Sequence, residues 1–269
     1  MVRSRLVLSL VAAGLALIGS PLGAVVTPAS TAPRASFAAE PEEDCAENVP
    51  ASHAVAGVND TGRPVSLDVL VLLDGISKSS AQRTMSIAAQ SYAPVKIKLR
   101  VVGYRAVRFR SDGQEFSRPT RDAAAMMADV KAATRRSRPK GVDVVLALTN
   151  KAIYIKGPGG DRVYGIAGMA DCIGGVRYGR RSFAFGVGDY GTTDWPARDA
   201  AITAAHEVGH LLGAHHHYAN CAEGGPPPAM CTVMFNASLD PMGMSINSQR
   251  FGVLESAVVR GHAVDYARP

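Results

Sequence analysis

The sequence predicts an α/β (α+β) domain built on a mostly parallel, twisted sheet that carries helices. Two observations predict this class. Between residues 64 and 148, apolar segments with strand character alternate with segments whose apolar residues have helical spacing. Strands that alternate with helices are typical of a parallel sheet covered by helices. The roughly 200 residues from position 64 onward are enough for one domain with a well-filled core.

The individual elements follow from local patterns. Residues 95–109 alternate Val, Ile and Leu with Lys and Arg, as a half-buried strand does, whereas residues 142–148 form the continuous apolar run of a buried strand. The glycine-rich residues 151–178 are expected to be mostly loop, with a short edge strand at 163–170. The other expected strands are 65–73 and 182–187, and the expected helices are 77–91, 119–136, the helix of the histidine motif described next, and 247–261.

A histidine motif supplies the most specific chemistry in the chain. It reads His206-Glu207-x-x-His210-x-x-Gly213-x-x-His216. Helix positions four apart lie on one face, about 5–6 Å apart, so the first two histidines can hold one metal ion while Glu207 reaches a water at that metal. A continuous helix would carry His216 roughly 120° away from that face. The third ligand therefore requires the helix to end, and Gly213 accepts the backbone conformation of such a turn.

Three neutral imidazoles and one water make the open zinc site of a hydrolase rather than a closed structural site. The alternative interpretation is a buried amphipathic helix with chance histidines. The chain has only 7 histidines, so five fixed positions in this order are hard to produce by chance. His215 and His217 flank the third ligand, and the spacing selects His216.

The eleven-residue motif resembles that of the metzincin metallopeptidases. A methionine turn typical of that family is found in Cys231-Thr232-Val233-Met234-Phe235-Asn236. The Cys before this methionine, and Gly165-Ile166-Ala167-Gly168-Met169-Ala170-Asp171-Cys172 upstream, are similar to the reprolysin (adamalysin) branch. Two positions depart from the family patterns. His217 stands where reprolysins usually carry Asp, and no Tyr follows two residues after Met234, as it does in branches with a tyrosine ligand.

The resemblance implies a zincin-like domain over residues 63–269. Its upper subdomain is expected at 63–216, and its small, irregular lower subdomain with a terminal helix at 217–269. In this family the methionine forms an apolar floor beneath the zinc, which implies that role for Met234 without making it a ligand. The family also binds the substrate backbone along an edge strand, for which residues 163–170 are the candidate. The alternative for that segment is a plain surface hairpin.

The first residues of the chain read as a targeting segment. Arg3 and Arg5 precede an apolar run of thirteen residues at 6–18, which is short for a bilayer span of about 20 residues. We expect a signal peptide at 1–24, with cleavage after residue 24 or as late as residue 38, and the alternative is an uncleaved anchor. Residues 25–62 lack periodic apolar positions and are expected to be a linker or a short pro-segment.

The chain contains four cysteines, which after a signal peptide suggest two disulfides formed in an oxidising compartment. Cys221 and Cys231 flank a short proline-rich loop and are expected to pair. Cys45 and Cys172 then remain, and a bridge between them would tie the N-terminal segment to the edge-strand loop. The rival role for Cys45 is that of a zinc-blocking thiolate in a pro-segment, as in some metzincins.

The formal net charge is +6 and the pI is about 9.3, with basic clusters at 100–110, 131–140 and 177–181 that predict a solvated basic face. No segment resembles a nucleic-acid-binding module, so no nucleic-acid partner is expected. We also expect a protein or peptide substrate, no stable membrane insertion after signal cleavage, and a monomer.

The predicted function is that of a secreted zinc metalloendopeptidase with one catalytic zinc, in which a zinc-activated water attacks the peptide bond and Glu207 is the general base. Two alternatives stay open: a catalytically silent, secreted zinc-containing binding module such as an adhesin or inhibitor, and a zinc amidase with a non-peptide substrate. Glu207 argues against the silent module, because a structural zinc site needs no base.

Overall fold

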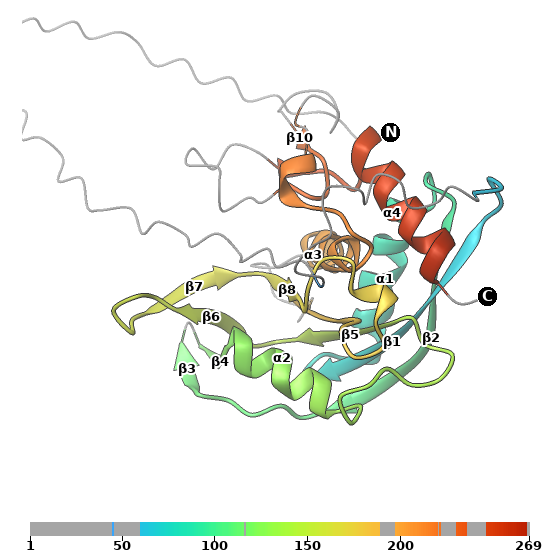
Figure 1. Cartoon of the computed structure of the whole chain (residues 1–269). Helices are drawn as coiled ribbons and strands as arrows, with labels where there is room; N and C mark the ends of the chain where they lie inside the picture. The colour runs from blue at the N-terminus through green and yellow to red at the C-terminus, as the bar shows by residue number, and fades with distance from the viewer. Residues whose placement is uncertain are drawn as a thin grey trace, which may run out of the picture. The chain divides into compact units, whose positions relative to one another are not determined.

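The main sheet has five strands in the order β2-β1-β5-β9-β8 (Figure 1). The computed structural model describes residue 45 and residues 60–115, 117–188, 197–219, 221, 230–235 and 246–267. The predicted signal peptide (1–24) and most of the predicted linker (25–62) lie outside these residues. Four strands run parallel, and β8 is antiparallel to β9. The strand bounds are β1 Val65–Asp74, β2 Ile97–Val107, β5 Val144–Thr149, β8 Gly168–Ala170 and β9 Phe183–Val187.

The burial of the strands follows their sequence patterns. Every residue of β5 is buried, as its continuous apolar run predicts, because helices cover both faces of the central strands. β2, at one edge of the sheet, alternates between covered and exposed positions, as a strand covered on only one face does. These observations confirm the predicted mixed α/β fold with a mainly parallel sheet.

Helices lie on both faces of the main sheet (Figure 1). α1 (Lys78–Tyr92) and α3 (Ala197–Leu211) pack on one face, where their apolar residues form a core with alternate β1 residues such as Val69 and Val71. α2 (Ala123–Ala132) packs on the other face, where Met126 and Val130 join Phe185 in a second core. The sheet is therefore the middle of three layers, and α3 is held in place by the core beneath it.

A second sheet corrects two predictions. β3 (Gly113–Glu115), β4 (Arg118–Asp122), β6 (Ala152–Lys156) and β7 (Arg162–Ile166) form a four-stranded sheet in the order β3-β4-β6-β7. The helix predicted at 119–136 begins later, because residues 118–122 pair as a strand and the Asp122 side chain accepts the Ala125 N–H at 3.0 Å as a cap. Residues 151–178 are likewise not mostly loop, because β6 and β7 form a hairpin within them.

The predicted edge strand at 163–170 is divided between the two sheets. Residues 162–166 belong to β7, whereas residues 168–170 form β8 at the edge of the main sheet. Gly165 has a φ of +108°, a conformation that glycine adopts readily, and it lies just before the point where the chain passes from one sheet to the other. Between the two strands, the Ala167 carbonyl accepts the Val187 N–H at 2.7 Å.

The C-terminal part of the chain ends in a helix, as predicted. After α3 come the short 3-10 helix η3 (His216–Tyr218), the paired strands β10 (Met230–Cys231) and β11 (Ile246–Asn247), and α4 (Val253–Tyr266). α4 begins later than the predicted residue 247 because residues 246–247 pair with β10, and it extends beyond residue 261.

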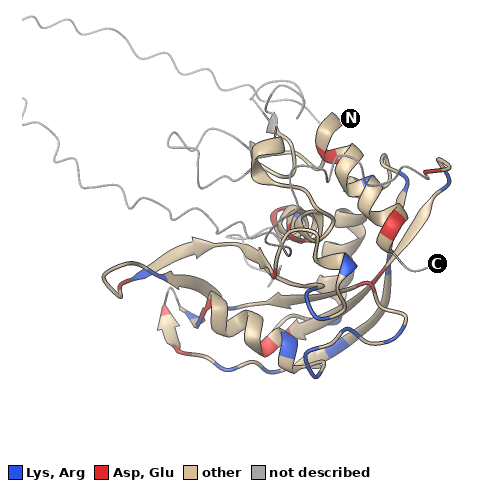
Figure 2. Cartoon of the chain, in the orientation of Figure 1, with Lys and Arg blue, Asp and Glu red and all other residues tan. Residues whose placement is uncertain are grey.

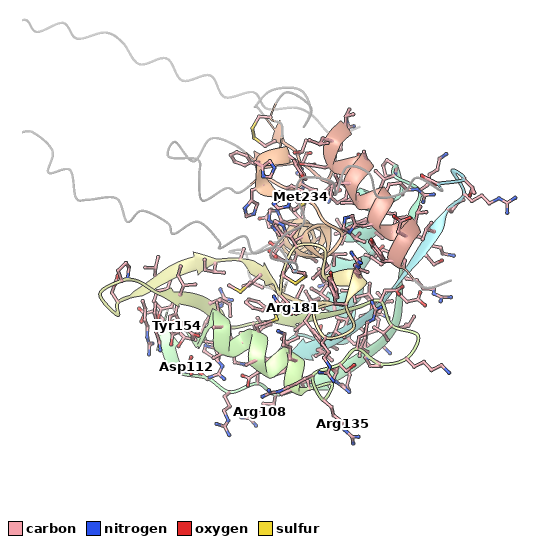
Figure 3. All side chains as sticks on the ribbon, in the orientation of Figure 1. Arg108, Asp112, Arg135, Tyr154, Arg181 and Met234 are labelled. Atoms are coloured by element: carbon pink, nitrogen blue, oxygen red, sulfur yellow. A yellow bond between two sulfur atoms is a disulfide. The ribbon has the colours of Figure 1, made fainter. Side chains whose placement is uncertain are left out.

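Charged residues are spread over the surface loops and over β2 (Figure 2). Arg108 and Arg135, from two of the predicted basic clusters, are exposed and extend away from the ribbon (Figure 3). In the part of the chain that the structure describes, no helix combines the length and the apolar character needed to cross a membrane.

Candidate metal centre

Two of the predicted zinc ligands lie on one face of α3. His206 and His210 are one helical turn apart, and their Nε2 atoms are separated by 3.0 Å. Both rings are buried, because the same helix places Val208 and Leu211 in the core between α3 and the main sheet. The packing of the helix therefore fixes where the two rings lie.

The third ligand reaches them because the helix ends two residues before Gly213. This glycine has a φ of +90°, and a Cβ at this position would lie 2.6 Å from Nε2 of His262, so both the backbone and the packing require glycine. The chain then turns back and places His216 Nε2 3.0 Å from His206 Nε2 and 3.1 Å from His210 Nε2. The structure thus brings the three predicted ligands together.

Backbone carbonyls orient the first two rings. His206 Nδ1 lies 2.7 Å from the Val233 carbonyl oxygen, and His210 Nδ1 lies 2.7 Å from the Ala214 carbonyl oxygen. A carbonyl oxygen only accepts hydrogen bonds, so each Nδ1 carries the proton and donates it. Each Nε2 is then left with a lone pair, which is the state that binds a metal.

The nitrogen cluster fits a zinc ion. Lone pairs on nitrogens 3.0–3.1 Å apart repel one another unless a cation lies between them. Imidazole nitrogens are common zinc ligands in proteins, so these three atoms could hold one zinc ion together. Among the described residues, no further His, Cys, Asp or Glu joins the cluster, which is the open arrangement of a catalytic zinc. The three histidines form the site of one catalytic zinc ion.

Met234 is fully buried next to α3 (Figure 3). A Cβ built on Gly209 would lie 2.6 Å from the Met234 sulfur, so the thioether packs directly against the backbone of α3 next to His210. The preceding residue, Val233, binds His206 through its carbonyl. The methionine segment therefore supports the centre by packing and by orienting one ligand.

Glu207 is also buried, with a relative exposure of 2%. A Cβ built on Gly168 would lie 2.5 Å from Glu207 Oε1, so the carboxylate lies directly against β8, the edge strand of the main sheet. The Glu207 carboxylate thus lies between α3, which carries His206 and His210, and β8, which belongs to the segment predicted to align a substrate.

Tyr92, at the end of α1, has a role that sequence reasoning missed. Its hydroxyl donates to the Ala205 carbonyl at 2.7 Å, and its ring packs edge-on against Phe251 with ring centroids 5.1 Å apart. Burial raises the pKa of Tyr92 well above its usual value of 10.0, and the negative charge of Glu207 adds to this effect. Tyr92 is therefore neutral and supports α3 one residue before the first ligand. A single Tyr in an amphipathic helix gives no local signal for this contact.

The neighbouring histidines do not join the centre. His215 and His217 lie with their ring centroids 4.8 Å apart and both pack against Tyr218. The structure therefore places His216, rather than either neighbour, beside His206 and His210.

Both predicted disulfides are present. Cys221–Cys231 joins the segment after η3 to the methionine segment. Cys45–Cys172 ties the N-terminal segment to the loop after β8, and the Cys45 N–H donates to the Ile173 carbonyl at 3.1 Å. Cys45 is thus bonded to Cys172 and does not act as a zinc-blocking thiolate in this structure.

Two histidines on one helix and a third from the turn that follows it converge beside a mainly parallel sheet, and this arrangement defines a zinc metallopeptidase. The chain belongs to the reprolysin-like metallopeptidases: the family model "Metallo-peptidase family M12B Reprolysin-like" matches residues 78–217, which is more than half of the chain. The matched residues include the histidine motif, so this result confirms the resemblance to the reprolysin branch; the methionine turn lies beyond the matched residues.

Several solved structures are similar to this chain at low sequence identity. Archaemetzincin from Methanopyrus kandleri is 15% identical, with 73% of this chain and 95% of that chain covered and a TM-score of 0.49. Metalloproteinase-II from Bacteroides fragilis is 16% identical, with 69% and 50% covered and a TM-score of 0.44. A zinc-dependent peptidase from Methanocorpusculum labreanum is 16% identical, with 71% and 99% covered and a TM-score of 0.42. A comparison with curated proteins found no match.

Proposed function

We propose that this metallopeptidase is a secreted endopeptidase in which Glu207 is the general base. The observation that carries the proposal is the position of the Glu207 carboxylate, which is buried next to the ligand His206 and lies against Gly168 of the edge strand. A base at this position would be adjacent both to a metal held by the histidines and to a peptide aligned on β8. A structural zinc site would need no base beside the metal and no substrate strand beside that base.

Zinc held by the three histidines would polarise a peptide carbonyl and make a water nucleophilic near neutral pH. Glu207 accepts the proton of the attacking water and later delivers it to the leaving amine. His206 and His210 keep their Nδ1 protons on backbone carbonyls, so their Nε2 atoms remain available as ligands. Met234 supplies an apolar surface beneath the ligands and takes no part in proton transfer.

The edge strand supports cleavage within a chain rather than at its end. β8 is the last strand in the order of the main sheet, and its described backbone partner is β9. An extended substrate could add to β8 by strand pairing and continue past Gly168 in both directions. Specificity for internal bonds would follow from this arrangement.

Export is the second part of the proposal. The basic and apolar residues of the first 18 positions have the pattern of a signal peptide. The two disulfides support it, because such bonds persist in oxidising compartments. N-terminal sequencing of protein recovered from the culture medium should find a start after residue 24 or residue 38. Protein that stays in the cells with an intact N-terminus would refute secretion.

The test of the chemistry is hydrolysis of a mixed-sequence quenched peptide library by the zinc-loaded protein. Glu207→Gln is the matched variant, because it keeps the size of the side chain and removes the base. It should retain one zinc per chain by elemental analysis and lose nearly all turnover, and a chelator should abolish wild-type cleavage reversibly.

Each other outcome points to a different function. Cleavage only at chain ends would indicate an exopeptidase, and cleavage only of non-peptide amides would indicate an amidase. A wild-type protein with one zinc and no hydrolysis would be a silent binding module. Substantial turnover by Glu207→Gln would mean that another group is the base.

A further inference from the structure

The methionine segment is held from the side of α4 by a buried pair of side chains. Thr232 Oγ1 donates to Glu255 Oε1 at 2.5 Å, and neither residue is exposed to solvent. The other carboxylate oxygen accepts the Gly252 N–H at 2.8 Å at the start of α4. A buried carboxylate is costly unless its oxygens accept hydrogen bonds, so this short contact holds Thr232 in one position.

The next residue connects this pair to the metal centre. The Val233 N–H donates to the Arg250 carbonyl at 2.8 Å, and the Val233 carbonyl accepts the Nδ1 proton of His206 at 2.7 Å. The position of that carbonyl determines both the tautomer and the ring plane of His206. Any displacement of Thr232 moves the residue that carries this carbonyl.

We propose that Thr232 and Glu255 are positioning residues for the zinc ligand His206, acting through the Val233 carbonyl. A glutamate that only capped α4 would need the Gly252 N–H alone, yet the second oxygen of Glu255 binds the methionine segment, 23 residues earlier in the chain. The inference rests on the part of the function in which the three histidines hold zinc. It does not depend on which bonds the enzyme cleaves.

The experiment measures the zinc affinity of the folded, full-length protein by competition with a chromogenic chelator. Thr232→Val keeps the shape of the side chain and removes the donor, while the bond from Glu255 to Gly252 remains. Loss of an outer hydrogen-bond partner typically lowers metal affinity by about 10–100-fold, and we expect about tenfold for this indirect link. Glu255→Gln should have a similar effect, and the double variant should lose little more, because both changes break the same link. Thr232→Ser should restore the wild-type affinity.

The second readout is the NMR signal of the His206 Nδ1–H in zinc-loaded protein with ¹⁵N-labelled histidine. In Thr232→Val this proton should shift and exchange faster with solvent, because its carbonyl partner is less well held. Ser77→Ala is the matched control: it removes the cap of α1, where Ser77 Oγ accepts the Ser80 N–H, and so lowers stability far from the metal ligands. Its zinc affinity and its His206 signal should equal those of the wild type.

The proposal is overturned if Thr232→Val and Glu255→Gln lower the melting temperature as Ser77→Ala does but leave zinc affinity and the His206 signal unchanged. The pair would then only support α4. If Glu255→Gln does not fold, the comparison of Thr232→Val with Thr232→Ser decides, since the α4 cap stays intact in both. A wild-type protein that binds zinc but cleaves no peptide would refute the proposed endopeptidase and leave this comparison valid.

Discussion

Gly168→Ala should displace the Glu207 carboxylate and leave zinc binding unchanged. The added Cβ would lie 2.5 Å from Glu207 Oε1, 2.7 Å from Glu207 Cγ and 2.8 Å from the Phe185 carbonyl oxygen. Ordinary carbon–oxygen contacts are about 3.3–3.6 Å, so the carboxylate must move by close to 1 Å. The Phe185 oxygen belongs to the neighbouring strand β9, so the methyl group cannot be relieved on that side without moving backbone.

The expected loss follows from that displacement. A misplacement of about 1 Å in an active site can lower the rate about 100-fold, which corresponds to roughly 2.7 kcal/mol of transition-state stabilisation. Overpacking should also lower the free energy of unfolding by about 1–3 kcal/mol. No ligand nitrogen is among the nearest neighbours of the added methyl group, so the zinc affinity should not change.

The assay compares kcat/KM on one fluorogenic peptide, chosen from the library screen, with zinc content and urea unfolding measured on the same samples. Gly103→Ala is the matched control: it also lies in a strand, but its Cβ would lie 3.4 Å from Leu70 Cδ1, an ordinary contact. It should keep wild-type activity. If Gly168→Ala loses stability yet keeps wild-type kcat/KM, the carboxylate need not occupy its observed position, and the assignment of Glu207 loses its structural basis.

Three further predictions test the ligand choice and the support of the fold. His216→Ala should lower zinc affinity by more than about 100-fold, because a direct ligand contributes more to the affinity than a residue that only hydrogen-bonds to a ligand. His215→Ala should leave the affinity unchanged. Equal losses in the two variants would show that the spacing selected the wrong residue. Asp60→Asn should destabilise the protein at neutral pH, because hydrogen bonds from Arg260 lower the pKa of Asp60 from 3.8 to about 2. A depressed folded-state pKa gives stability that is present above the unfolded-state pKa and lost as the pH falls through the folded-state value. The difference in free energy of unfolding between Asp60→Asn and the wild type, measured in urea, should therefore shrink between pH 5 and pH 2. A constant difference would refute the ion pair as its cause. Tyr92→Phe should lower the free energy of unfolding of the zinc-loaded protein by about 1–2 kcal/mol, because a buried hydroxyl hydrogen bond is lost; an unchanged value in urea titration would mean that the bond has no net effect.

Much of the α/β core was predictable because its signals are local. β1, β5 and β9 are apolar runs whose short length and flanking residues indicate strands, and α1 has apolar residues at helical spacing, so local patterns identify all four elements. The second sheet was not predictable in this way. Its strands β3 and β4 are short and rich in charged residues, and they become strands by pairing with neighbours rather than by burying an apolar face.

The sequence by itself determined the chemistry of the centre. The spacing of His206, Glu207 and His210 places them on one helical turn whatever surrounds the helix, and Gly213 permits the turn that returns His216. The Cys221–Cys231 disulfide was expected from the short loop between the two cysteines, whereas the sequence left Cys45 open between a bridge to Cys172 and a zinc-blocking thiolate, and the structure shows the bridge.

Only the tertiary structure decided how the centre is held. His206 takes its orientation from a carbonyl 27 residues away, and the Tyr92 hydroxyl supports a helix 113 residues away. Position 168 has no room for a side chain, because the pairing of β8 with β9 places it against Glu207. These contacts join segments that meet only after the sheet and its helices have packed, and no local period encodes which carbonyl or which glycine will lie there. The ligands are therefore set by spacing, and their geometry by long-range hydrogen bonds and packing.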